Sequence, residues 1–173
     1  MAVAFMANAQ HLVYRKDILK KLNIDVPKTY EDMLAAAKKI RVSGLVKNPV
    51  GGAYKAGWNL AQEFNNMFIG YGGSHFKGNS AEPNVNSDAG IKALKMMKSL
   101  SEYMNPDFLT HDSNATNAEF RAGNVAIMNM WGSRAATLVD ADGVSMEVKN
   151  GMDIAGPMTC LLYTSDAADE SVS

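Results

Sequence analysis

The sequence predicts an α/β domain in which a few-stranded sheet is flanked by helices. Two long segments, 29–41 and 87–101, carry apolar side chains at helical spacing directly after residues that can cap a helix. Short apolar segments at 2–14, 124–130 and 152–158 lie between helical stretches and predict buried strands. Helices that alternate with isolated strands are typical of layered α/β domains.

The two long helices have the clearest signals. Thr29 can accept hydrogen bonds from the free backbone N–H groups of the first helix, and Asp32 completes a pattern close to a capping box. The buried stripe of this helix is expected to be Met33, Leu34, Ala37 and Ile40. The second helix begins after Ser87, and its buried stripe is expected to be Ile91, Leu94, Met97 and Leu100.

The remaining elements are shorter. Helices are expected for RKDILKKLNI, for WNLAQEFNNMFIGYGG up to its glycine pair, and for NATNAEFRAG. WGSRAATLVD is expected to turn into a helix with Ser133 as its cap. Segments 43–57 and 75–85 are rich in Gly, Asn and Pro and are expected to be loops.

Composition excludes several classes of protein. The chain has 173 residues, 47% of them hydrophobic and 20% charged, which is ordinary for a globular protein. The net charge of −1 predicts no nucleic-acid partner. No apolar run approaches the ~18 residues that a membrane-spanning helix needs.

No catalytic or metal-binding pattern is present in the sequence. His11, His75 and His111 lie far apart, without the spacing of a metal site, and no cofactor is expected. Gly132-Ser133-Arg134-Ala135 lacks the second glycine of a nucleophile elbow. No pair of carboxylates can be assigned acid and base roles from spacing alone. An enzyme therefore stays open as an alternative without a pattern that supports it.

The end of the chain differs from the rest. Residues 160–170, CLLYTSDAADE, match the translation of a common transposon-based sequencing adapter and include the only cysteine. We therefore expect the biological sequence to stop near Thr159 and residues 160–173 to be a non-native tail. Such a tail is expected to make few contacts with the core.

Aromatic and polar side chains occur together where elements meet. Trp131 ends a predicted strand, while Trp58 and Asn59 begin a predicted helix with Gln62 and Glu63 one turn further on. Aromatic faces stack on the C–H faces of sugars, and amides and carboxylates bind sugar hydroxyls. The alternative is that both tryptophans belong to the core.

Five segments, in order, resemble the extracellular solute-binding proteins of ABC sugar importers, family 1, of the maltodextrin-binding type. The segments are LVYRKDILKKLNIDVPKTYEDMLAAAKKI, GYGGSHF, PNVNSDAGIKALKMMKSL, EFRAGNVAIMNMWGSRA and MDIAGPM. The resemblance covers residues 1–159. It implies one lobe, the second, of a type II periplasmic-binding-protein fold, with 2–14 and 152–158 as hinge strands. The other lobe, the signal sequence and the C-terminal helices would be missing.

The resemblance also implies a function. A sugar or polyol would bind in a cleft between two lobes, without covalent chemistry, and an ABC permease would be the membrane partner. The protein would be a periplasmic or extracellular lipoprotein. Asn8, Gln62 and Glu63 match cleft positions of the family, whereas Trp131 comes two residues earlier than the family's tryptophan. Ser133 and Arg134 share its junction and are expected to offer hydrogen-bond donors. The alternative is one lobe of a carbohydrate-processing enzyme.

Overall fold

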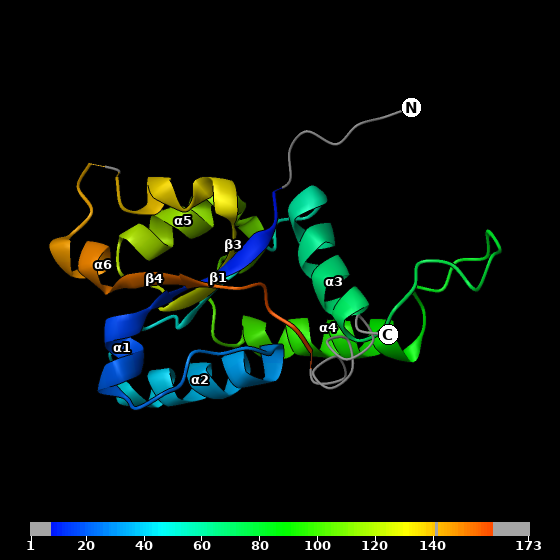
Figure 1. Ribbon diagram of the computed structural model, residues 1–173, viewed down its shortest axis with the longest axis horizontal. Coiled ribbons are helices and arrows are strands. Elements are labelled where there is room, and N and C mark those ends of the chain that lie inside the picture. Colours follow the sequence, from blue (N-terminus) through cyan, green and yellow to red (C-terminus); the bar gives the residue numbers. More distant parts are fainter. Residues whose placement is uncertain (1–7, 141, 161–173) are drawn as a thin grey trace, which may run out of the picture.

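The computed structural model describes residues 8–140 and 142–160 and contains a four-stranded sheet (Figure 1). Its order is β2-β3-β1-β4. β1 runs antiparallel to both β3 and β4, whereas β2 runs parallel to β3. The strands are β1 (Gln10–Arg15), β2 (Val50–Gly51), β3 (Ile127–Trp131) and β4 (Met152–Ala155).

The described residues also contain six α-helices and three short 3-10 turns. The helices are α1 (Lys16–Lys21), α2 (Tyr30–Ser43), α3 (Trp58–Gly70), α4 (Asp88–Ser101), α5 (Ser113–Arg121) and α6 (Met146–Gly151). The 3-10 turns are η1 (Phe108–Thr110), η2 (Gly132–Arg134) and η3 (Ala136–Leu138).

Each face of the sheet has its own hydrophobic core. Leu12 and Tyr14 of β1 join the larger core, which also contains side chains from α1, α2, α3 and α4. Val13, which points the other way because side chains alternate along a strand, joins a smaller core with Phe120 of α5 and Val148 of α6. Figure 1 shows the same three layers, with α1, α2 and α4 below the sheet and α5 and α6 above it. The predicted α/β fold class is therefore confirmed.

The N-terminus of α2 has the capping box that the sequence predicts. The Thr29 hydroxyl accepts a hydrogen bond from the Asp32 backbone N–H at 3.1 Å, and the Asp32 carboxylate accepts one from the Thr29 N–H, also at 3.1 Å. These bonds satisfy backbone groups that the first helical turn leaves without intrahelical partners. The helix ends at Gly44, whose φ of 70° is the left-handed conformation that glycine adopts easily.

The buried face of α4 differs from the prediction. Met97 and Leu100 are buried as expected, but Ile91 and Leu94 are 46% and 58% exposed. The small residues Gly90 and Ala93 are buried in their place. A Cβ atom at position 90 would lie 1.9 Å from the Val85 carbonyl oxygen, so glycine permits this close approach. The helix is therefore turned so that its smallest residues face the core.

Two further local predictions were wrong. The loop expected at 43–57 contains β2, which pairs with β3. The helix expected after Trp131 is instead a pair of 3-10 turns, and Ser133 lies inside the first turn without capping it through its side chain. The Ser133 backbone N–H instead donates to Oδ1 of Asn8 at 3.2 Å.

The ends of the chain are described only in part. β1 and β4, which correspond to the two predicted hinge strands, lie side by side in the sheet. The predicted strand residues 2–7 and tail residues 161–173 lie outside the described part. Cys160, however, contradicts the expectation of few core contacts, because it is fully buried. Its small side chain fits against the helix carrying Gly70, where a Cβ atom would come within 2.8 Å of the sulfur.

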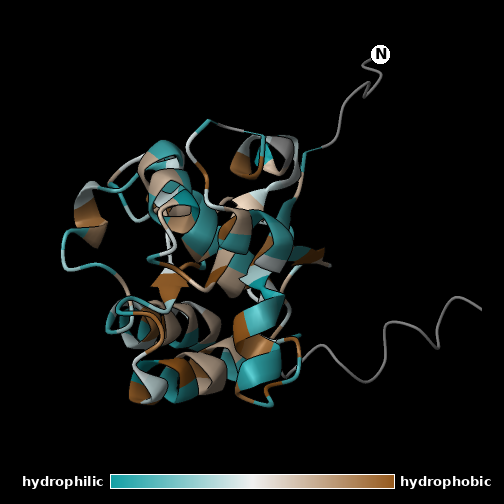
Figure 2. Cartoon of the chain, turned by 90° about the vertical axis from the view of Figure 1, so that its left-hand side faces the viewer, coloured by the Kyte–Doolittle hydropathy of each residue, from teal (hydrophilic) through white to brown (hydrophobic). Residues whose placement is uncertain are grey.

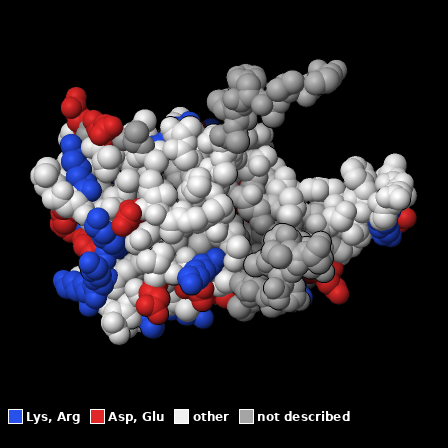
Figure 3. All heavy atoms as spheres, viewed as in Figure 1, with Lys and Arg blue, Asp and Glu red and all other residues white. Residues whose placement is uncertain are grey.

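Polar and charged side chains cover the outer surfaces of the layers. Figure 2 shows hydrophilic residues on the outward turns of the helices and hydrophobic residues at the sheet between them. On the face shown in Figure 3, charges of both signs gather over α1, α2 and α6, and the middle of that face carries few. Among the described residues, no helix combines the length and apolar character needed to cross a membrane.

Candidate functional site

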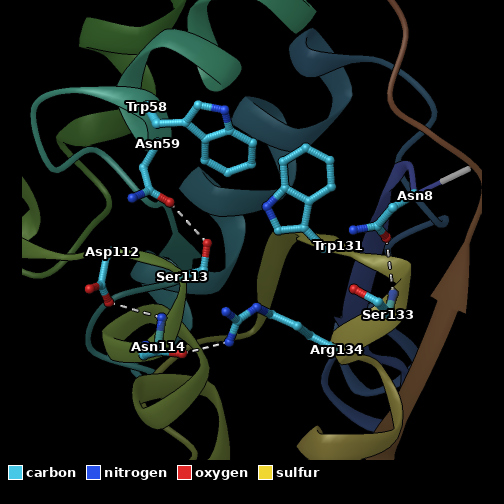
Figure 4. A pocket seen from close by; sticks show the side chains of 9 residues that line it. All are labelled: Asn8, Trp58, Asn59, Asp112, Ser113, Asn114, Trp131, Ser133 and Arg134. Carbon is cyan, nitrogen blue, oxygen red and sulfur yellow. Dashed lines mark hydrogen bonds between the residues drawn. The ribbon is translucent and has the colours of Figure 1, made fainter.

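Two hollows lie on either side of Trp131, where β3 ends. The first has a volume of about 360 Å³ and is drawn in Figure 4. Six of its lining residues were predicted as site residues: Asn8, Trp58, Asn59, Trp131, Ser133 and Arg134. Sequence reasoning missed three others, which begin α5: Asp112, Ser113 and Asn114. The structure therefore brings most of the predicted set together in one place.

The two tryptophans stack on each other at the rim. Their ring centroids are 5.2 Å apart and the ring planes differ by 25°. Trp58 is the first residue of α3 and is 61% exposed, and Trp131 is the last residue of β3 and is half-buried. The alternative that both tryptophans belong to the core is therefore wrong. Figure 4 shows the two indoles side by side above the polar floor of the hollow.

The floor of the first hollow is held by hydrogen bonds between its own side chains. Ser113 donates through its hydroxyl to Asn59 Oδ1 at 3.0 Å, and Arg134 donates through Nη1 to Asn114 Oδ1 at 2.5 Å. These bonds join α3 to α5 and η2 to α5 (Figure 4). Side chains fixed in this way lose little entropy when a ligand binds, which favours affinity.

Among the described residues that line the first hollow, Asp112 is the one carboxylate, and its side chain caps the N-terminus of α5. It caps this helix, accepting from the backbone N–H of Ala115 at 3.1 Å and of Asn114 at 2.9 Å. These two bonds, together with nearby Lys55 and Arg134, hold the pKa of Asp112 below its usual value despite some desolvation. An Asp directly before a helix is a capping signal, so the sequence offered a clue to its position.

The second hollow has a volume of about 390 Å³ and shares Asn8 and Trp131 with the first. Gln62, also predicted as a site residue, lines it. Its other lining residues are Ala9, Gln10, Tyr30, Asn66, Ile69, Asn129, Pro157 and Met158. No charged side chain is among these described lining residues. Gln10 and Trp131 are directly opposite each other in the β1–β3 ladder, so the sheet fixes the spacing between the hollows.

Glu63 was predicted to contact ligand, but the structure places it in neither hollow. It is 3% exposed, beneath the second hollow, and accepts a hydrogen bond from Gln10 Nε2 at 3.2 Å. Burial raises the pKa of its carboxyl to about 7, although hydrogen bonds from Gln10 and Asn129 oppose the rise. The error has a simple cause: Gln62 and Glu63 are adjacent on a helix, where successive side chains point about 100° apart.

The two hollows offer aromatic surface, amides, hydroxyls and one guanidinium. Such a set can bind a polar ligand that has apolar C–H faces and many hydroxyls. No group of three His, Cys, Asp or Glu side chains that could hold a metal ion occurs within residues 8–140 and 142–160. Both hollows lie at the end of β3, at the edge of an α/β sheet, which is a place where ligands commonly bind.

Comparison with known proteins gives the family. The sequence profile of the bacterial extracellular solute-binding proteins matches residues 2–157, and the chain therefore belongs to this family. Among curated proteins, a probable sugar-binding periplasmic protein from Mesorhizobium japonicum is 28% identical over an alignment of 124 residues that covers 67% of this chain and 28% of the relative.

Solved structures of solute-binding proteins have the same fold. An ABC-transporter solute-binding protein from Agrobacterium radiobacter K84, in complex with ribitol, matches 92% of this chain and 40% of its own, with a TM-score of 0.78 and 27% identity. One from Agrobacterium vitis S4, with bound D-mannitol, matches 90% and 38% with a TM-score of 0.78; at 23% identity it shows the likeness of fold alone.

The chain therefore spans less than half the length of these relatives. Its four-stranded sheet with flanking helices corresponds to one lobe of a periplasmic-binding-protein fold, as predicted. Family members are bacterial extracellular or periplasmic binding proteins and not enzymes. The predicted alternative of an enzyme lobe is thus not supported.

Proposed function

We propose that the protein is the substrate-binding component of an ABC importer and that it binds a sugar or polyol at the two hollows beside Trp131. One observation carries the proposal: two stacked indoles form the rim of a hollow whose floor is made of amides, hydroxyls and a guanidinium. The relative from Agrobacterium radiobacter K84 was solved with ribitol, a polyol, which supports this ligand class.

The proposed mechanism is closure of a second wall over the ligand. The first hollow lies between the start of α3 and the end of β3, and the second lies between the rest of α3, the end of β3 and the segment after β4. A ligand held there has one side bound by this lobe and the other side free. In the proposed two-lobed protein, hinge motion about β1 and β4 brings the second lobe against that free side. No bond in the ligand is made or broken.

The partner and location follow from the same proposal. The loaded protein would deliver its ligand to an ABC permease, and a lipid anchor on the two-lobed protein would hold it near that permease at the membrane surface. The family and the curated relative are extracellular or periplasmic, which supports this location.

A glycoside-cleaving enzyme would need a different arrangement. Its two catalytic carboxyl groups lie about 5–10 Å apart across the scissile bond. Asp112 is the only carboxylate among the described residues that line the first hollow, and it is committed to the α5 cap. None lines the second hollow. These arrangements favour binding over hydrolysis.

The test is calorimetric titration of the full-length gene product with ribitol, mannitol and maltose. We expect saturable binding of at least one of them and unchanged ligand after prolonged incubation. Failure of all three up to millimolar concentration would overturn the ligand class. Slow hydrolysis of maltose that Asp112→Asn abolishes would instead favour the enzyme alternative.

A further inference from the structure

Glu63 is a buried carboxylate that forms no ion pair within the described part of the chain, and hydrogen bonds link it to the surface of the second hollow. Gln10 donates through Nε2 to Glu63 Oε1, and its own carbonyl oxygen accepts from Nδ2 of Asn66. Gln10 and Asn66 line the second hollow, whereas Glu63 does not. The three side chains form a chain of hydrogen bonds from the buried carboxyl to the surface.

The negative charge of the Glu63 carboxylate determines the direction of both hydrogen bonds, the one to Gln10 and the one from Asn66 to Gln10. An ionised carboxylate can only accept hydrogen bonds. Gln10 must then turn its NH₂ group toward Glu63, which leaves its carbonyl oxygen for Asn66. Asn66 must in turn use its NH₂ group for Gln10, so its carbonyl oxygen remains available to a ligand.

We propose that Glu63 is a positioning residue for the second hollow: its buried carboxylate orients the amide of Gln10 and, through it, that of Asn66, so that the hollow presents an acceptor to ligand hydroxyls. This inference rests on the proposed sugar-binding function. It also gives a role to a residue that the sequence suggested as a direct contact and that the structure buries.

Protonation of Glu63 removes the constraint on the orientation of the Gln10 amide. A neutral carboxyl has an O–H group that can donate to the Gln10 carbonyl, so both amide orientations become available. Burial raises the pKa of Glu63 to about 7, so the change falls near neutral pH. We expect the ligand to bind the ionised form more tightly, because one fixed acceptor pattern needs no reordering when the ligand arrives.

Among the described residues, burial and hydrogen bonds, and not a neighbouring charge, determine the pKa of Glu63. Tyr30 of α2 and Tyr54, which follows β2, are the titratable groups that interact with it, and burial raises the pKa of both phenols. Both therefore stay neutral while Glu63 titrates. Among the described residues, no Lys, Arg or His forms an ion pair with Glu63.

The first arm of the test needs no ligand. The side-chain amide resonances of Gln10 and Asn66, followed by NMR, should shift with a midpoint near pH 7 in the wild type. They should not shift in Glu63→Gln, which keeps the shape and removes the titration. Glu82→Gln, which removes an exposed carboxylate paired with Lys77, is the matched control and should titrate like the wild type. Amides that do not respond to pH, or that respond equally in Glu63→Gln, would overturn the proposal.

The second arm uses ribitol, mannitol and maltose. Affinity should be about three- to tenfold higher well above pH 7 than well below it, the size of one hydrogen bond. By linkage, binding near pH 7 should release protons, measured as a dependence of the calorimetric enthalpy on the buffer. Glu63→Gln should abolish both effects, and His11→Gln, which removes the nearby imidazole on β1, should keep them.

The outcomes separate this inference from the proposed function. Binding whose affinity is independent of pH, in a protein whose amides do titrate, would overturn the role of Glu63 and leave the sugar-binding function standing. Failure of all three ligands would overturn the proposed function, and the NMR arm would still decide whether Glu63 orients the amides.

Discussion

Trp58 and Trp131 stack with ring centroids 5.2 Å apart, although one begins α3 and the other ends β3. They are the only two tryptophans of the chain. Intrinsic fluorescence and the coupled absorption of the two indoles therefore report directly on the candidate site. Each indole covers one face of the other. A sugar can therefore stack only on the uncovered face of either ring, unless the two rings first move apart.

Trp131→Ala should weaken sugar binding in the full-length gene product by about ten- to a hundredfold, because the ligand loses ~1–3 kcal/mol of aromatic contact. The cost in stability should be below the ~3–5 kcal/mol of a core tryptophan, since Trp131 is only half-buried. Titration calorimetry and thermal melting measure the two effects. Phe76→Ala, an exposed aromatic outside both hollows, is the control and should leave affinity unchanged. Unchanged affinity with a collapsed melting temperature would make Trp131 a packing residue.

Trp58→Phe and Trp131→Phe should each abolish the exciton couplet that two stacked indoles produce in the circular dichroism spectrum. Trp58 is 61% exposed, so its replacement should change the free energy of unfolding by less than about 0.5 kcal/mol. A couplet that survives either single replacement would mean that the indoles do not stack in solution.

The sequence was informative where one local signal determines the structure. Thr29 and Asp32 predict the start of α2, since a capping box depends only on residues three apart. The sequence grouped five residues that line the first hollow because they flank element ends, and element ends meet at the edge of a sheet: Trp58, Asn59, Trp131, Ser133 and Arg134. Their role in binding stays a prediction.

The sequence was uninformative where packing between elements determines which face of a helix is buried. In the sequence, Ile91 and Leu94 fit an apolar helical stripe no less well than Gly90 and Ala93, which are the residues that the structure buries. Only the close contact at Gly90 selects the buried face. Glu63 follows Gln62 in the chain, but which of them faces a hollow depends on how α3 is rotated against the sheet. The role of Asp112 in the first hollow needs the position of α5, which no local pattern provides.

Glu63→Gln should remove a pH dependence from the stability of the protein. The ordinary pKa of 4.5 holds in the unfolded chain, and the folded value is about 7. Between these values the folded state keeps a proton that the unfolded state releases, so the free energy of unfolding falls as pH rises and levels off above about 7. The loss is up to about 3 kcal/mol. Urea denaturation across this range measures it, and equal slopes for wild type and variant would contradict the prediction.

Thr29→Ala should lower the free energy of unfolding by about 1–2 kcal/mol, because the buried start of α2 loses its side-chain cap. Thr29→Ser keeps the capping hydroxyl and should cost no more than the ~0.8 kcal/mol of one buried methyl group. Chemical denaturation of both variants separates the cap from the rest of the side chain. Equal losses in the two variants would mean that packing of the Thr29 methyl group, and not the cap, stabilises this end.

Truncation at two points should show where the fold ends. Thr159 accepts a hydrogen bond from the Tyr30 N–H and donates one to the Lys28 carbonyl, both at 3.0 Å. Cys160 is fully buried, and burial raises the pKa of its thiol to about 12. Removing residues 161–173 should therefore leave the melting temperature within about two degrees, whereas removing 159–173 should lower it by about 5 °C or more. A large drop in the first variant would show that the residues after Cys160 are part of the native fold, and the adapter-like sequence would then have to be regarded as native.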